Sequence, residues 1–356
     1  MNPNEIIFFS SFLLLISLFL FLDLGVFDKK SHIISFRESI IWTSIWVTLA
    51  VIFFFFIRHF GYLIHGIDDI EQLKMVASKY QEKFSIDNLS FTEALKVYQQ
   101  NLSLEYITGY IIEYSLSIDN IFVIILVFSS FGIHQMHYKR ILFWGIIGAV
   151  IMRFTFIFLS SALIQKYEWI LYVFGAFLVF TGVKMFLDRN KTQEVNPEKN
   201  PIVKWLSKRF PITKELHGQK FMVKINGKVN LTPLFICLVV IELTDLIFAV
   251  DSVPAIFSVT KDPYIVFFSN IFAILGLRSL FFLVNNIMNM FRFLKIGLAV
   301  LLTFIGVKML AVHWLESIGF ETQHSLYIIF GIISLSIIAS IFIPDSDKKA
   351  NNKLIR

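Results

Sequence analysis

Residues 231–257, LTPLFICLVVIELTDLIFAVDSVPAIF, carry three acidic side chains in a segment that is otherwise apolar enough to cross a lipid bilayer. A second segment of the same kind, LEYITGYIIEYSLSIDNIFVIILVF, covers residues 104–128. A carboxylate at the centre of a bilayer costs about 2.5–3.5 kcal/mol on the translocon scale, so acids at this depth are typical of functional sites. The five candidates in these two segments are Glu113, Asp119, Glu242, Asp245 and Asp251.

The composition of the whole chain indicates a polytopic membrane protein. Of its 356 residues, 56% are hydrophobic and 16% are charged, and the mean hydropathy is +0.71. Apolar stretches long enough to cross about 30 Å of hydrocarbon recur along the sequence. Because the first of them lacks a basic leader and a small-residue cleavage site, we expect it to be retained. The pattern predicts an all-α fold with about nine transmembrane helices, at 6–27, 40–57, 104–130, 140–163, 168–187, 231–257, 263–284, 294–312 and 324–343.

Basic residues are distributed unevenly between the two sides of this predicted layout. When the N-terminus is placed outside, the loops rich in lysine and arginine fall inside, as the positive-inside rule requires. We therefore expect an external N-terminus and a cytoplasmic C-terminus, and we attribute the net charge of +6 to this topology rather than to binding of nucleic acid. In the first long connection, 58–103, Ser90 and Glu93 form a capping box that predicts a short helix through about residue 100. The second long connection, 188–230, is either a solvated linker or a basic surface against anionic lipid.

The two acidic segments belong to an internal repeat. FTGVKMF at 180–186 returns as FIGVKML at 304–310, and SIDNIF at 117–122 resembles AVDSVP at 249–254. Each unit contains three predicted spans, so consecutive units enter the membrane from opposite sides, which is the construction of many secondary transporters. The predicted organisation is two N-terminal spans (1–57), an extracytoplasmic loop (58–103), a first repeat (104–187), a basic cytoplasmic loop (188–230), a second repeat (231–312), a last span (313–343) and a basic tail (344–356).

The repeat predicts one central site between its two halves. Asp119 and Asp251 occupy related positions, so a pseudo-two-fold axis would bring them face to face, with Asn120 and Ser252 adding neutral oxygens. Pro254 deprives the carbonyl four residues earlier of its helical partner and so offers one more oxygen. The remaining acids are predicted as secondary ligands, a second station or proton carriers. They are Glu113, Glu242 and Asp245.

The ligand types point to a hard divalent cation. Oxygen-only sites suit Mg²⁺, Ca²⁺ or Mn²⁺, whereas Zn²⁺ and copper usually recruit His or Cys. The residues themselves do not distinguish among the first three ions. Clustered acids in a medium of low dielectric constant would bind protons when the cation is absent, which makes proton-coupled exchange a hypothesis. The alternative is structural, with Arg153 and Arg278 pairing with the acids to lock helices together.

The motifs resemble those of the TerC family, within the LysE-type transporter superfamily. The resemblance extends from about residue 6 to 343 and is carried by EYSLSIDNIFV (113–123), WILYVFGAFLVFTGVKMF (169–186), VVIELTDLIFAVDSVPAIFSVTKDPYIVFFSNIFAILGLR (239–278) and LKIGLAVLLTFIGVKML (294–310). It implies a manganese exporter of the bacterial inner membrane, and some members of the family are linked by name to tellurium resistance. The family's acidic motif residues fall on the five acids named above. This chain departs from many members at Tyr114, where they have lysine.

Three functions follow as hypotheses. The first is a divalent cation exporter, for Mn²⁺ by resemblance, that uses a proton gradient. The second is a Ca²⁺/H⁺ exchanger. The third is a membrane scaffold that recruits soluble partners through its basic loop in an envelope-stress or tellurite-resistance complex. We expect no enzyme activity and no prosthetic group, because no nucleophile–base set, phosphate-binding loop or cofactor fingerprint is present. The sequence leaves the oligomeric state open.

Overall fold

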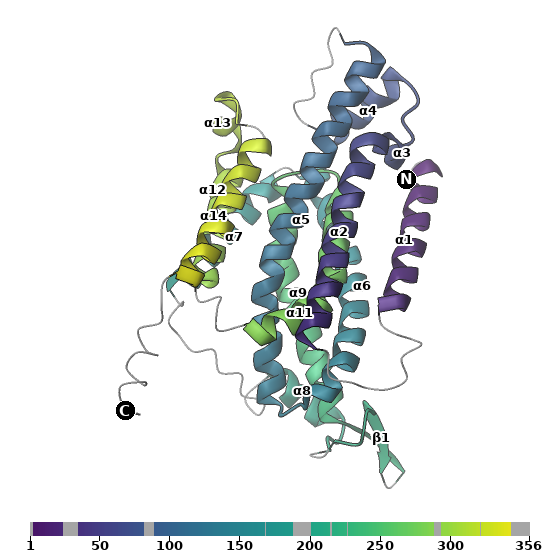
Figure 1. Cartoon of the computed structure of the whole chain (residues 1–356), viewed down its shortest axis with the longest axis vertical. Coiled ribbons are helices and arrows are strands. Elements are labelled where there is room, and N and C mark those ends of the chain that lie inside the picture. Colours follow the sequence, from purple (N-terminus) through teal and green to yellow (C-terminus); the bar gives the residue numbers. More distant parts are fainter. Residues whose placement is uncertain are drawn as a thin grey trace.

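The structure, a computed structural model, is a bundle of helices with a small β-hairpin at one end (Figure 1). It describes residues 3–23, 35–81, 89–167, 169–187, 201–213, 216–225, 227–287, 293–320 and 322–342. The first half contains α1 (Pro3–Asp23), α2 (Phe36–Phe60), α3 (Tyr62–His65), α4 (Ile70–Tyr80), α5 (Phe91–Ser130), the 3₁₀ turn η1 (Gln135–His137), α6 (Tyr138–Lys166) and α7 (Trp169–Leu187). The second half contains α8 (Pro201–Arg209), β1 (Met222–Ile225), β2 (Lys228–Leu231), α9 (Pro233–Phe257), α10 (Pro263–Leu275), α11 (Leu277–Ile287), α12 (Leu294–Leu310), α13 (Val312–Ser317) and α14 (Thr322–Phe342).

The predicted all-α polytopic class is confirmed. Six of the described helices are long and apolar enough to cross a membrane, and the pair α10 and α11, bent by 44° at Gly276, would make a seventh. Two shorter apolar helices lie at Asn4–Phe19 and Ile296–Leu310. The nine predicted spans all fall on these segments, but the count of nine as membrane crossings stays a prediction. The span predicted over 263–284 corresponds to this bent pair.

For α5, the predicted start is correct and the predicted end is wrong. The predicted capping box is present, since Ser90 Oγ accepts from Glu93 N at 3.4 Å and Glu93 Oε2 accepts from Ser90 N at 3.0 Å. The helix it starts does not stop near residue 100, however, but runs unbroken for 40 residues to Ser130. Buried apolar residues continue along its face from Ala94 through Leu102, so packing carries the helix across the predicted boundary. The described part of the connection 58–103 therefore consists of the last turn of α2, α3, α4 and the first turns of α5.

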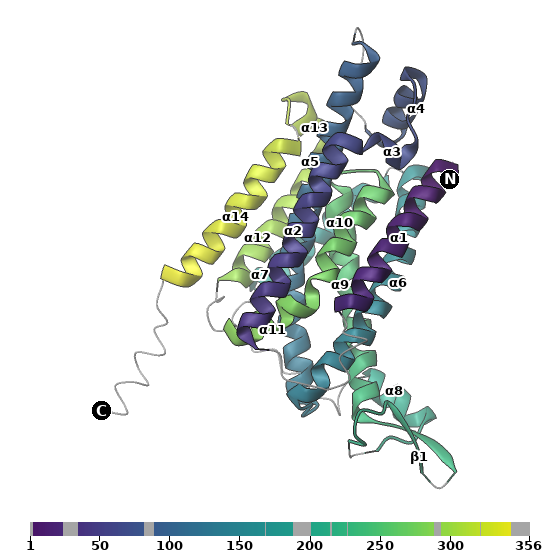
Figure 2. The same cartoon turned by 45° about the vertical axis from the view of Figure 1, so that its right-hand side comes forward.

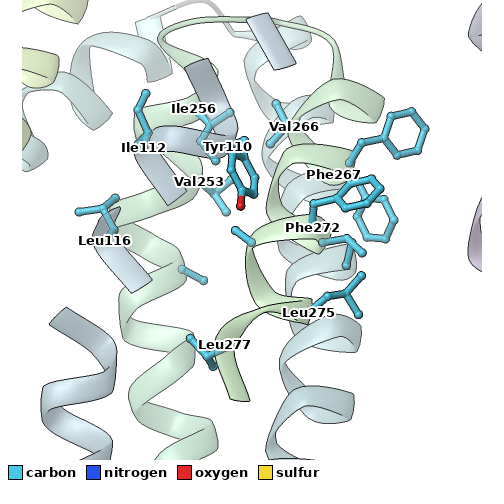
Figure 3. Close-up of a cluster of buried hydrophobic side chains, with 14 of the residues drawn as sticks. Tyr110, Ile112, Leu116, Val253, Ile256, Val266, Phe267, Phe272, Leu275 and Leu277 are labelled. Carbon is cyan, nitrogen blue, oxygen red and sulfur yellow. The ribbon is translucent and has the colours of Figure 1, made fainter. Parts of the chain in front are cut away.

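The core is built around α10, whose thirteen residues are all buried. Aromatic rings of α1 and α2 pack on it, with Phe12 and Phe268 only 4.4 Å apart between ring centroids. Figure 3 shows buried apolar side chains of this core that come from α5, α9, α10 and α11. The labelled members are Tyr110, Ile112, Leu116, Val253, Ile256, Val266, Phe267, Phe272, Leu275 and Leu277. A helix that is apolar on all sides requires such a surround, because it has no polar face to expose.

Two ends of the bundle carry additional elements. At one end, α3 and α4 lie near the start of α1, and at the opposite end lie α8 and the β-hairpin (Figures 1 and 2). The hairpin is antiparallel, with Met222 opposite Leu231. Leu206 of α8 is buried in a small cluster with Leu231 and with Ile236 of α9. This cluster holds α8 beside the first turns of a membrane-spanning helix.

Helices α7 and α12 cross at glycines that permit close backbone approach. A Cβ placed on Gly182 would lie 2.8 Å from the carbonyl oxygen of Ala299, and one on Gly306 would lie 2.6 Å from that of Gly175. The contacts are reciprocal: Gly182 and Gly306 are equivalent in the FTGVKMF and FIGVKML motifs, and Gly175 and Ala299 lie seven residues before them. As residue numbers rise along α7, those of its partners fall along α12. The pair is thus antiparallel, as an inverted repeat would require, although that repeat stays a prediction for the other helices.

We predict that Gly306→Ala destabilises the protein by about 1–3 kcal/mol, because the new methyl group overlaps backbone that cannot rotate away. Gly331→Ala in α14 is the matched control, since nothing lies within 4 Å of a Cβ placed there. That change should be neutral or stabilising by about 0.5–1 kcal/mol, the usual gain from removing glycine from a helix. Unfolding of the purified protein in detergent measures both. Equal effects of the two substitutions would show that the crossing is not tightly packed.

Candidate functional site

A buried arginine of α6 contacts three other helices of the bundle. Arg153 is 1% exposed, and its Nη1 donates hydrogen bonds to Glu113 Oε1 of α5 and to Asn270 Oδ1 of α10. Its Nη2 lies 3.6 Å from Asp245 Oδ1 of α9. Glu113 and Asn270 have no exposed surface, and Asp245 is 9% exposed. A charge at this depth is tolerated only when it is paired, so the arginine and its carboxylates depend on one another.

Local helix geometry places a third carboxylate on the same face of α9 as Asp245. Glu242 and Asp245 are three residues apart on α9 and therefore share one face of that helix. The half-buried Glu242 side chain lies against Gly148 of α6, where a Cβ would overlap its carboxylate. Gly148 thus leaves the room that Glu242 occupies. We call Glu113, Arg153, Glu242, Asp245 and Asn270 the acidic centre.

Several oxygens on α5 and α9 are buried without a hydrogen-bond partner among the described residues. They include the second carboxylate oxygens of Glu113 and Asp245, Oε2 and Oδ2. The hydroxyl oxygens of Ser117, one turn after Glu113, and Ser252, two turns after Asp245, are in the same state. A buried acceptor without a partner costs free energy, about 1–3 kcal/mol and more for a charged group. Such oxygens are suited to receive a cation or protons.

The charges of the acidic centre do not balance. Three carboxylates, from Glu113, Glu242 and Asp245, accompany the single guanidinium of Arg153. When all are ionised, two negative charges exceed what this arginine neutralises. A divalent cation would match that excess. Among the described side chains, however, no three of His, Cys, Asp or Glu stand close enough together to hold a metal ion.

The side chains that the structure describes include only part of the predicted central site. Asp119 and Asp251 lie within α5 and α9, but their side chains fall outside the described residues, so their predicted meeting stays a prediction. Their neighbours Asn120 and Ser252 are buried, 3% and 1% exposed. Helix α9 continues through Pro254 without a break. The acids predicted as secondary, Glu113 and Asp245, are the ones that the described structure brings together, on Arg153.

The contacts of Arg153 support part of the alternative in which arginines pair with the acids to lock helices together. Arg153 does lock α5, α6 and α9 through Glu113 and Asp245, as that alternative requires. Arg278 is also buried, at 4% exposure, in α11. The pairing leaves Glu242 and the unpartnered oxygens unexplained, so structural pairing does not account for the whole centre.

Some members of the centre were missed in the sequence. Asn270 is an amide in the otherwise apolar segment 263–275, which was a usable signal for a buried polar contact. Gly148 gave none, because a helical glycine does not reveal which side chain it accommodates. Glu105 was also passed over, although it lies in the acidic segment of α5. It is 8% exposed and accepts a hydrogen bond from Thr260 Oγ1 at 2.6 Å.

Comparison with known proteins gives consistent matches along the chain. A family model described as integral membrane protein TerC family matches residues 98–348. Membrane protein STKORF319 of Myxococcus xanthus is 38% identical over 345 residues, or 96% of this chain and 95% of that protein. Alx of Escherichia coli (strain K12), provisionally named a membrane-bound redox modulator, is 37% identical over 333 residues, or 93% of each chain. No solved structure matches.

We predict that Arg153→Met destabilises the protein by about 3–5 kcal/mol, because Glu113 and Asp245 would then be buried without a counter-charge. Combining it with Glu113→Gln and Asp245→Asn should restore most of the loss. Lys166→Met at the exposed end of α6 is the control and should change stability by no more than about 0.5 kcal/mol. Unfolding in detergent measures all three. A combined variant as unstable as Arg153→Met alone would contradict the charge-pairing argument.

Proposed function

The chain belongs to the TerC family of integral membrane proteins, and we propose that it exports Mn²⁺ across the membrane through the acidic centre. The observation that carries the proposal is the set of buried carboxylate and hydroxyl oxygens without partners on the facing helices α5 and α9. Oxygen ligands in this number suit a hard divalent cation. The choice of Mn²⁺ rests on the resemblance to the family, and the ion is the substrate rather than a resident cofactor.

The proposed cation pathway combines described and predicted ligands. Glu113 and Asp245 each offer one carboxylate oxygen to Arg153 and retain a second oxygen for the cation. Glu242 adds a third carboxylate on the same face of α9 as Asp245. Asp119 and Asp251 extend the site by prediction, with Asn120 and Ser252 beside them. In this arrangement Arg153 holds the carboxylates in place while the ion is absent.

Charge balance supports an exchange of the cation for protons. When the divalent ion leaves, its two positive charges must be replaced, because the centre lies in a medium of low dielectric constant. Protons can bind directly to the carboxylates that the ion vacates. The reciprocal crossing of α7 and α12 supports two halves of opposite sense that rock against each other, as in transporters built from inverted repeats. The bend at Gly276 supplies a break in the helix beside the centre.

The proposed setting is the bacterial inner membrane, with the N-terminus outside and the C-terminus in the cytoplasm. The end that carries α8 and the hairpin would then face the cytoplasm. Its side chains Lys204, Lys208 and Arg209 are exposed, as is Trp205 at 59%. Tryptophan and basic residues beside the start of a spanning helix suit contact with anionic lipid headgroups.

We predict that Glu113→Gln, Asp245→Asn, Asp119→Asn and Asp251→Asn each raise cellular manganese in cells that depend on this protein for efflux. Each removes a negative oxygen from the pathway, whereas Glu71→Gln in the exposed first turn of α4 should have no effect. The measurement is total manganese and calcium in cells grown with added Mn²⁺, with membrane levels of every variant shown to be equal. Raised calcium with normal manganese would favour the Ca²⁺/H⁺ exchanger instead.

Normal values of both metals in all four variants would favour a non-transport role. The scaffold hypothesis then predicts that reversing the charge of Lys204 and Lys208 abolishes resistance to envelope stress or to tellurite, while metal levels stay normal.

The name of Alx raises a redox role as another hypothesis for that relative. This chain contains a single cysteine, Cys237, which is buried, so it cannot form an intramolecular disulfide.

We predict that uptake of Mn²⁺ into everted membrane vesicles requires a lumen that is more acidic than the medium. Protons leaving the lumen would then be exchanged for the entering cation. Manganese is measured in the vesicles with and without a proton-exchanging ionophore, and vesicles containing Asp245→Asn serve as the control. Uptake that is insensitive to collapse of the pH gradient would rule out proton coupling while leaving transport itself intact.

A further inference from the structure

A second buried group of charged side chains lies at the end of the bundle that carries α3 and α4. His65, the last residue of α3, stands between two carboxylates. Its Nδ1 atom is 2.9 Å from Glu5 Oε1 of α1, and its Nε2 atom is 2.8 Å from Asp262 Oδ2 in the turn between α9 and α10. His65 is 2% exposed, Asp262 is 0% and Glu5 is 9%. None of these residues belongs to the acidic centre.

The group joins parts of the chain that are far apart in sequence. His65 is 60 residues from Glu5 and 197 residues from Asp262. Asp262 also caps α10, since its Oδ1 accepts from the backbone N–H of Tyr264 at 2.9 Å. The Tyr264 hydroxyl donates to Glu5 Oε2 at 3.1 Å. Through these contacts, α1 and α3 are fastened to the first turn of the buried helix α10.

The geometry favours one charge state of His65. A neutral imidazole has one N–H donor and one acceptor nitrogen, so it can donate to only one carboxylate. The other carboxylate would then face a nitrogen lone pair in a buried place. The imidazolium donates to both, and hydrogen bonds between charged partners are about twice as strong as neutral ones. Two flanking carboxylates therefore favour the protonated ring, which donates to both.

Other titratable groups face this bridge from the packed elements. The rings of Tyr80 of α4 and Tyr264 of α10 lie 5.2 and 5.4 Å from the imidazole, between ring centroids. The carboxylate of Glu105 on α5 is bonded to Thr260, whose Oγ1 accepts from the Asp262 backbone N–H at 3.2 Å. Further groups nearby are Tyr98 on α5, Lys79 over the Tyr80 ring, Lys261 beside Asp262, and Lys308 of α12, which donates to the Ser258 carbonyl at 2.8 Å.

These surroundings set the pH range over which the ring is charged. Burial lowers the pKa of His65, but Asp262 and Glu5 outweigh it and raise the pKa from 6.5 to about 9. A histidine whose pKa is raised by folding stabilises the folded state fully below its ordinary pKa of 6.5. That stabilisation is lost as the pH rises through about 9. The bridge is thus closed at neutral pH and weakens in alkali.

We propose that Glu5, His65 and Asp262 form a proton-operated latch, a binding site for one proton that fastens α1 and α3 to the start of α10 and releases them when His65 is deprotonated. The latch does not depend on the proposed transport of a cation. It bears on the acidic centre through α10, because Asn270 lies eight residues after Asp262, about 12 Å along the helix axis. Release would free the end of the helix that supplies a hydrogen-bond acceptor to Arg153.

Hydrogen exchange of the full-length, metal-free protein in lipid nanodiscs tests the latch. At pH 7.5, His65→Gln should exchange about tenfold faster than wild type at residues 3–9, 62–67 and 258–266, as expected for loss of charge-assisted bonds. His59→Gln is the matched control, because this histidine of α2 is exposed and its Nδ1 contacts the Phe55 carbonyl of its own helix, four residues back. Residues 172–184 at the α7–α12 crossing should be unchanged in both variants.

A pH series then separates the latch from a general loss of stability. After correction for base-catalysed exchange, wild type should lose the same protection as the pH passes about 9, and His65→Gln should show no such step. Glu5→Gln, which keeps the bond to Asp262, should shift the step to lower pH. If His65→Gln does not fold, ¹⁵N-histidine spectra of the wild type decide. A neutral His65 ring at pH 7.5, or protection that persists to pH 10.5, would overturn the proposal, whatever the result of the transport assays.

Discussion

The bundle depends on one buried guanidinium that is shared by three helices. Lipid supplies little hydrophobic force between helices in a membrane, so packing and polar contacts must hold them together. Arg153 provides such a contact to α5, α9 and α10 at once. Because a guanidinium cannot be left unpaired at that depth, the acids around it are fixed in position, and Glu113 and Asp245 each keep one buried oxygen without a hydrogen-bond partner among the described residues. The same interaction therefore stabilises the helices and arranges the candidate site.

Much of this could be predicted from the sequence because the signals are local. Apolar runs predict membrane helices, and the Ser90 capping box predicts the residue at which α5 begins. The cost of a carboxylate in lipid selected Glu113 and Asp245 as functional candidates without knowledge of their neighbours. The spacing of the glycine motifs in α7 and α12 likewise indicated equivalence, and the contacts of Gly182 and Gly306 agree with it.

The remainder depends on contacts between distant residues, which helical periodicity does not determine. It gives the face on which a side chain lies but not the helix that covers that face, so the partner of Arg153 among five acids could not be chosen. His65 gave no signal of its own, since its two carboxylates are 60 and 197 residues away. Gly276 has ordinary right-handed helical angles, and so its bend is set by packing rather than by turn chemistry.

The complete burial of α10 also constrains how the protein is made. Phe9 and Phe12 of α1 pack against Phe267 and Phe268, more than 250 residues later in the chain. Helix α1 can pack early on α2 and α6, through Phe53 and Phe158, but it cannot reach α10 until the second half of the chain has been synthesised and inserted. Until then, the face of α1 that α10 covers must be in contact with lipid or with insertion factors. Assembly of this bundle thus brings together helices that are made at very different times, rather than adding each helix in turn.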